Sequence, residues 1–231
     1  MHPVAKSTAA LAIVALLACC CLWVSQTALA EEPPVNADRV DFYRVPLMCP
    51  AARGLGCGMR AKPILIELER TPAVAEAWLD HNGETLAVVW GDKSPASERT
   101  ALLATISKQH AVHLEQLSGQ ARDASLTSFR SRQGWHRGAD VDRLSEQEAE
   151  VIADRLISRT ITKAPSAKDK MYALRPSLTE TIREQLVDAM PSTEECRKKL
   201  MTAARPHLNE NELSAFVSAF ELGYRPVGDE K

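Results

Sequence analysis

The chain has 231 residues, a formal net charge of −2 and a pI of about 6.3. It shows no basic stripe and no interleaving of basic and aromatic residues, which argues against nucleic acid as a partner. Of its six cysteines, three lie in an apolar N-terminal run, and the other three are too few for a disulfide-stapled scaffold.

The N-terminal 30 residues have the pattern of a signal peptide. Lys6 supplies the positive charge, Ala9–Val24 is an unbroken apolar run, and Ala28-Leu29-Ala30 is typical of a cleavage site. An uncleaved membrane anchor and a lipoprotein acylated at Cys19 are the alternatives. We therefore expect a periplasmic or secreted protein that meets a membrane only through this segment or a lipid anchor, with a polar leader at residues 31–39.

Residues 40–118 alternate strand-like apolar runs with stretches of helical periodicity. Val40–Cys49 is rich in β-branched and aromatic residues, and Asn82-Gly83 between two later runs predicts a hairpin turn. The predicted order is strand, helix, strand, strand, helix, strand. The four strands are expected at Val40–Cys49, Val74–Leu79, Thr85–Trp90 and Ala111–Leu117. The first helix carries Ile64, Leu65 and Leu68, and the second is expected at Ser97–Lys108.

The rest of the chain is expected to be a linker followed by helices. Residues 119–139 lose periodicity and collect Ser, Arg and Gly. Residues 140–231 predict a small all-helical domain, in which Ser or Asn three residues before Glu marks helix starts. These pairs are Ser145/Glu148, Ser177/Glu180, Ser192/Glu195 and Asn209/Glu212, and Gly223 is the expected C-cap of the last helix.

Residues 40–118 resemble a heavy-metal-associated domain, the family of copper chaperones and periplasmic mercury-binding proteins. Gly54-Leu55-Gly56-Cys57 stands where the family has Gly-Met-x-Cys, and Thr71-Pro72-Ala73-Val74 stands where it has its turn after the first helix. Arg60 occupies the place of the second family cysteine, and Cys49 is an additional thiol. The resemblance implies an α+β protein, with a ferredoxin-like βαββαβ domain followed by the helical domain.

Cys57 and Cys49 are the metal ligands that this reading implies. Soft thiolates suit Cu(I), Hg(II) or Zn(II), and the glycines of the intervening loop allow the two cysteines to meet. A helix N-terminus together with Arg60 and Lys62 is expected to lower the thiol pKa values. The sequence thus predicts an exported protein that captures or passes a soft metal ion, with the helical domain as a docking site for a protein partner.

Three alternatives stay open. Cys49 and Cys57 could form a structural disulfide in a non-enzymatic protein-interaction module, since disulfides persist in exported proteins. They could instead form a redox pair, although the usual Cys-x-x-Cys turn is absent, or be core thiols on a fold without metal. No nucleophile elbow, P-loop or zinc-protease motif is present, so no enzymatic activity is predicted.

Further side chains near these motifs have mostly structural interpretations. Met48 and Met59 flank the cysteines and could ligate Cu(I) but are more typical of core packing. The histidines His81, His110 and His113 are expected at the surface, and Trp135-His136 is expected to anchor the linker. Cys196 lacks a His or Asp partner in its local sequence.

Overall fold

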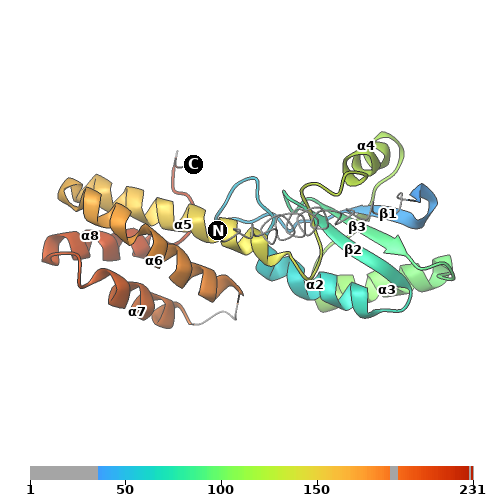
Figure 1. Ribbon diagram of the computed structural model, residues 1–231. Coiled ribbons are helices and arrows are strands. Elements are labelled where there is room, and N and C mark those ends of the chain that lie inside the picture. The colour runs from blue at the N-terminus through green and yellow to red at the C-terminus, as the bar shows by residue number, and fades with distance from the viewer. Residues whose placement is uncertain (1–35, 188–191, 229, 231) are drawn as a thin grey trace, which may run out of the picture. The chain divides into compact units, whose positions relative to one another are not determined.

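The computed structural model describes residues 36–187, 192–228 and 230. The predicted signal peptide and most of the polar leader lie outside these residues. Within them the protein is mixed α/β, with a five-stranded antiparallel sheet of order β4-β1-β3-β2-β5 and seven α-helices (Figure 1). The strands are β1 (Val40–Arg44), β2 (Val74–Asp80), β3 (Thr85–Trp90), β4 (Glu115–Gln116) and β5 (Trp135–His136).

Helices cover both faces of this sheet. The helices α2 (Gly58–Arg70) and α3 (Ala96–Gln109) pack on one face, where Leu65, Leu68 and Ile106 lie among inward strand side chains (Figure 1). Helix α4 (Gly119–Phe129) covers the other face. Alternate residues of a strand point to opposite faces of the sheet. In these strands the residues on both faces are apolar, so both faces need to be covered.

Helix α4 and strand β5 lie within the segment that we expected to be a linker. Phe129 packs edge-on against Phe42 and Trp135, with ring centroids 5.6 and 5.0 Å apart. The guanidinium of Arg132 lies 3.8 Å from the ring centroid of Phe129 and 4.7 Å from that of Trp78. A few aromatic anchors thus order a polar segment that has almost no apolar periodicity.

Two predicted strands are shorter than expected, and one turn differs in type. The first strand ends at Arg44 instead of Cys49, and the fourth is only Glu115–Gln116, because the chain before it turns at Ala111 with a φ of 48°. The β2–β3 turn has a positive φ only at Gly83. It is therefore not the two-residue type I′ turn, which needs two positive φ angles, and Asp80 closes it by accepting from the amides of Glu84 and Thr85.

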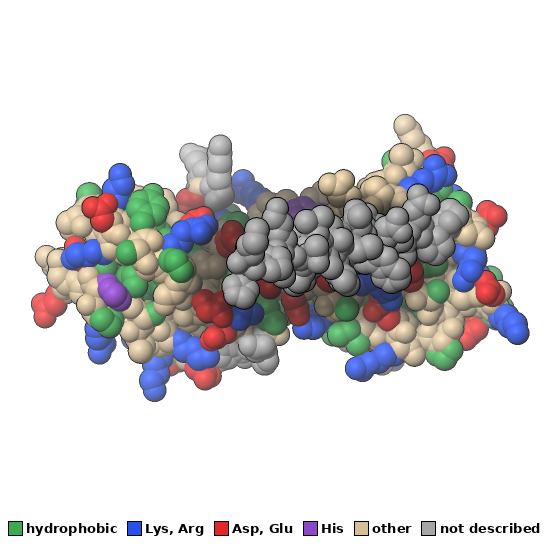
Figure 2. Space-filling model, viewed as in Figure 1, with side chains coloured by type: hydrophobic (Ala, Val, Ile, Leu, Met, Phe, Trp, Pro, Cys, Tyr) green, Lys and Arg blue, Asp and Glu red, His purple; other side chains and the backbone are tan. Residues whose placement is uncertain are grey.

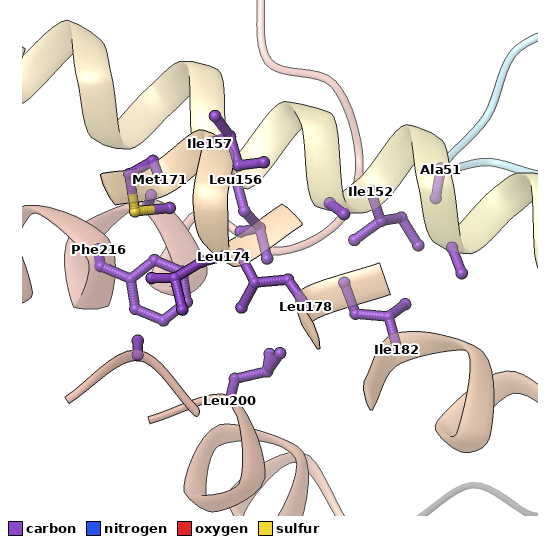
Figure 3. Close-up of a cluster of buried hydrophobic side chains, with 14 of the residues drawn as sticks. Ala51, Ile152, Leu156, Ile157, Met171, Leu174, Leu178, Ile182, Leu200 and Phe216 are labelled. Carbon is purple, nitrogen blue, oxygen red and sulfur yellow. The ribbon is translucent and has the colours of Figure 1, made fainter. Parts of the chain in front are cut away.

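The C-terminal half forms a helical core. Its helices are α5 (Asp142–Lys163), α6 (Lys168–Val187), α7 (Thr193–Ala204) and α8 (Glu210–Glu221), with a 3-10 turn at Pro165–Ala167. Fully buried side chains from these helices, including Leu156, Leu178, Leu200 and Phe216, face one another (Figure 3).

Two of the four predicted helix starts are correct. Ser192 and Asn209 accept from the amides of Glu195 and Glu212, and the second pair forms a full capping box. The predicted C-cap is wrong by one position: Leu222 is the C-cap of the last helix, and Gly223, with a φ of +73°, follows it. These two caps satisfy backbone donors that a helix start leaves without partners.

The other two predicted starts are wrong, because Ser145 and Ser177 lie inside α5 and α6. Helix α6 continues through Pro176 although proline lacks the amide proton for a helical hydrogen bond. Its inward residues Leu174, Leu178 and Ile182 bury on both sides of the proline. The described residues from Asn36 onward pack as one compact unit.

Candidate metal site at the cysteine ribbon

The two predicted ligands lie on a short antiparallel ribbon, Leu47–Cys57, which we call the cysteine ribbon. Met48 is bridged to Gly56. The amide of Cys49 donates to the Leu55 carbonyl and that of Cys57 to the Leu47 carbonyl, both at 2.7 Å. Side chains alternate along such a ribbon, so Cys49 and Cys57 lie on one face and Met48 on the other. Both thiols are buried, at 4% and 3% exposure, whereas Met48 is 51% exposed.

The β2–β3 turn supports the base of the ribbon. The amide of Gly56 donates to the His81 carbonyl at 2.7 Å, and that of Leu47 to the Gly83 carbonyl at 3.0 Å. A Cβ on Gly83 would come within 2.5 Å of the Leu47 carbonyl oxygen. Only glycine permits this approach, and its positive φ makes the same demand. The hairpin turn is therefore part of the scaffold that places the cysteines.

The ribbon register sets how far apart the cysteines are. Cys49 and Cys57 are diagonal neighbours, a relation that places residues about 7–8 Å apart. Disulfides join Cα atoms roughly 4.4–6.8 Å apart. All three described cysteines are free thiols.

Burial raises the pKa values of both thiols, whereas the sequence predicted that they would be lowered. Desolvation, followed by interaction with the Glu148 carboxylate, raises the pKa of Cys49 to about 12. Burial also raises the pKa of Cys57, although the amide and the charge of Arg60 act in the other direction. The expected lowering was wrong because the predicted exposed loop is in fact covered, and low dielectric disfavours the thiolate.

Polar groups on α5 face the same place. The Glu148 carboxylate has a side-chain hydrogen bond with the Cys49 thiol, but two polar atoms there have no partner among the described residues. Glu148 is 5% exposed, and its Oε2 atom has no hydrogen-bond partner among the described residues. The Oγ atom of buried Ser145 has no partner among them either. A Cβ on Gly58, which follows Cys57, would lie 2.5 Å from that Oγ atom. An unsatisfied buried polar group costs about 1–3 kcal/mol. Burial accordingly raises the pKa of Glu148.

Sequence reasoning missed Ser145 and Glu148 because it assigned them to a helix cap. The signal was present in their phase: Ser145, Glu148, Ile152, Arg155 and Arg159 recur at alternating spacings of three and four, and all are buried. Such spacing places residues on one helix face. Charged residues in phase with Ile152 therefore marked an interface with buried polar groups.

The methionines and histidines considered as further metal ligands differ in where they lie relative to the two thiols. Met59 packs against the cluster that contains both cysteines. Met48 instead lines a surface cavity of about 600 Å³ together with His113. His110 Nε2 lies 2.7 Å from a Glu67 carboxylate oxygen.

The other histidine pair and the third cysteine lie elsewhere. The ring centroids of His81 and His136 are 6.1 Å apart. Burial lowers the pKa of His136. Cys196 is buried on α7, and its thiol interacts with the Tyr224 hydroxyl.

The number and type of donor atoms on the ribbon decide which metal ions it could bind. Within residues 36–187, 192–228 and 230, no group of three or more His, Cys, Asp and Glu side chains is placed to hold a metal ion. Zn(II) sites normally use four ligands. Two thiols on one face offer the sulfur pair that soft ions such as Cu(I) and Hg(II) bind.

No protein-family model matches the chain, and neither the curated proteins nor the solved structures provide a significant match. In the part of the chain that the structure describes, every helix is too short or too polar to cross a bilayer.

Proposed function

We propose that this protein is an exported carrier that captures a soft metal ion, Cu(I) or Hg(II), between Cys49 and Cys57. The observation that carries the proposal is the ribbon register, which puts both thiols on one buried face at the N-terminus of α2. The mechanism is ligand exchange: an ion bound to incoming thiolates passes stepwise to the two cysteines, with no covalent chemistry at carbon.

The fold gives this proposal further support. We infer that β1, α2, β2, β3, α3 and β4 form a ferredoxin-like unit, in which the cysteines stand between the first strand and the first helix. The strand order β4-β1-β3-β2 and the alternation of strands and helices support that assignment. Strand β5 is an addition at the β2 edge.

The charges around the ribbon suit a bis-thiolate complex. Two thiolates and Cu(I) carry a net charge of −1, and two thiolates with Hg(II) are neutral. The charge of Arg60 acts on Cys57, and Arg155 interacts electrostatically with Cys49. These cations would offset a residual negative charge in a site from which water is largely excluded. Binding must displace the thiol protons, so affinity should rise with pH.

The described residues on one face of the protein carry charges of both signs (Figure 2). On the visible face, Lys and Arg side chains are interspersed with Asp and Glu instead of gathering in a stripe (Figure 2). A partner that delivers or receives the ion would be a protein with its own thiolates, and the helical half is our proposed docking surface for it.

The test is titration of the reduced protein with Cu(I) and Hg(II), next to Cys49→Ser, Cys57→Ser and Cys196→Ser variants. Cys196 is a matched control because it is also buried but lies on α7. We expect one tightly bound ion in the parent and in Cys196→Ser, and loss of tight binding in the other two. Equal binding by all four proteins, or by none, would refute the site and leave the protein-interaction module as the leading function.

A further inference from the structure

Helix α5 contacts the tip of the cysteine ribbon through one side chain in particular. Arg155 donates from Nη1 to the Ala51 carbonyl at 2.6 Å and to the Tyr224 carbonyl at 2.6 Å. Its side chain is only 4% exposed. Ala51 belongs to the loop that joins the two cysteines, so this arginine ties that loop to the helical half.

Apolar packing completes the contact. Ala51, Ala52 and both cysteines belong to the same buried cluster as Ile152 on α5. The close-up of this cluster shows Ala51 beside the α5 segment that carries Ile152 (Figure 3). The thiols are thus covered by the helical half rather than by their own sheet.

The same contact is imperfect in its polar groups. Among the described residues, the Ser145 Oγ atom and the Glu148 Oε2 atom are buried at this contact without a hydrogen-bond partner. A permanently closed interface gains nothing from such groups, whereas in an opened state water would satisfy them. Apolar packing therefore stabilises the covered state, whereas the unsatisfied polar atoms destabilise it.

We propose that α5 is a reversible cover over the cysteine ribbon, and that Arg155, by holding the Ala51 carbonyl, is the positioning residue that keeps the thiols covered. This inference rests on the proposed function only in its purpose, which is to control when an ion reaches the thiols. The opening itself is a property of the metal-free protein and is measured without metal.

The chain offers a matched control for Arg155 on the same helix face. Arg159, one turn later, is equally buried and donates to the carbonyls of Gly223 and Arg225 and to the Glu230 carboxylate. It anchors the C-terminal segment, and the hydrogen bonds found for it do not include the ribbon. Replacing either arginine by methionine removes buried charged hydrogen bonds, but only one replacement releases Ala51.

The experiment follows iodoacetamide modification of Cys49 and Cys57 in the full reduced chain carrying Cys196→Ser, read by peptide mass spectrometry. We expect Arg155→Met to speed modification of both thiols by about tenfold or more, given the strength of charge-assisted hydrogen bonds. Arg159→Met should change the rate far less, and Arg155→Lys, which keeps a donor, should restore much of the protection.

Electrostatics cannot produce the expected acceleration. Arg155 is a cation near Cys49, so its removal disfavours the reactive thiolate and by itself would slow modification. A faster reaction in Arg155→Met therefore reports exposure of the thiols rather than their activation.

A second measurement does not depend on how well the variants fold. In the Cys196→Ser parent, the modification rate is followed at low denaturant concentrations. A local opening exposes little surface and should depend on denaturant more weakly than global unfolding does. Equal dependence, or acceleration in both methionine variants in proportion to their lost stability, would overturn the proposal. Failure of metal binding would leave this result unaffected and would refute only the proposed function.

Discussion

Replacing Glu148 by glutamine should stabilise the protein at neutral pH and should do so less and less as the pH falls. Glu148 is buried on α5 with an unpartnered oxygen, and burial raises its pKa. Glutamine keeps the shape and removes the charge. Because an unsatisfied buried group costs about 1–3 kcal/mol, more if it is charged, we expect a gain of about 1–2 kcal/mol at pH 7–8. Unfolding temperatures of domains this size rise roughly 2–4 °C per kcal/mol.

The pH dependence has a definite sign. The folded-state pKa of Glu148 is raised, so the folded protein holds this proton more tightly than the unfolded chain, whose carboxyl has a pKa of about 4.3. The stability that the proton provides is complete below the unfolded pKa and is lost as the pH rises through the folded pKa. The difference between the variant and the parent should therefore be smallest near pH 4 and grow toward pH 8.

The assay is urea denaturation of both proteins between pH 4 and pH 8, with Glu150→Gln as the control on the exposed face of the same helix. We expect the control to change stability by no more than about 0.5 kcal/mol at any pH. A Glu148→Gln variant that is less stable than the parent at pH 8 would show that the carboxylate is satisfied, and the argument from buried polar groups at α5 would then fail.

Three further outcomes follow from the packing. Gly83→Ala should destabilise the fold by roughly 2 kcal/mol or more, since the new methyl would press on the Leu47 carbonyl oxygen and the backbone has a positive φ; unfolding in urea measures it, and a neutral result would mean that the ribbon base can shift. Leu156→Ala should cost about 2–5 kcal/mol because that side chain is fully buried in the helical core, and calorimetry would show a loss well below 2 kcal/mol if the site collapses. Glu230→Gln should make the stability of the protein less sensitive to acid, because hydrogen bonds from Arg159 lower the pKa of Glu230 to about 2. The stability from this partly exposed pair is present above the unfolded pKa and is lost as the pH falls from about 4 toward 2. Parallel curves of stability against pH for the parent and the variant in that range would contradict the prediction.

Local patterns predicted those elements whose form depends on neighbouring residues. The apolar run at Thr85–Trp90 is strand β3 at the expected residues, and Val74–Leu79 falls short of β2 by one. Caps at Ser192 and Asn209 satisfy their own helix starts and need nothing from elsewhere. Such elements can be read directly from a short window of sequence.

Elements that depend on distant partners were misread. Ser145 and Glu148 have the same local pattern as the true caps, but they lie in the middle of a buried face because α5 begins earlier, at Asp142. Likewise, α4 is ordered by Phe42 and other aromatic residues far away in the sequence. The cysteines could be named as a pair from the sequence, but their burial beneath α5 could not, because only the tertiary contact creates it.

The edges of the sheet have a consequence for how the protein behaves at high concentration. Three strands of five to seven residues lie in the centre, and the strands on either side, β4 and β5, have two residues each. Short outer strands present few free backbone amides and carbonyls, so a second chain finds little to extend. The outer strands themselves therefore offer little template for edge-to-edge aggregation. They cover only part of the strands beside them, since β4 pairs with Tyr43 and Arg44 and β5 with Leu79 and Asp80. An insertion that lengthened β4 would extend this template before it disturbed the core.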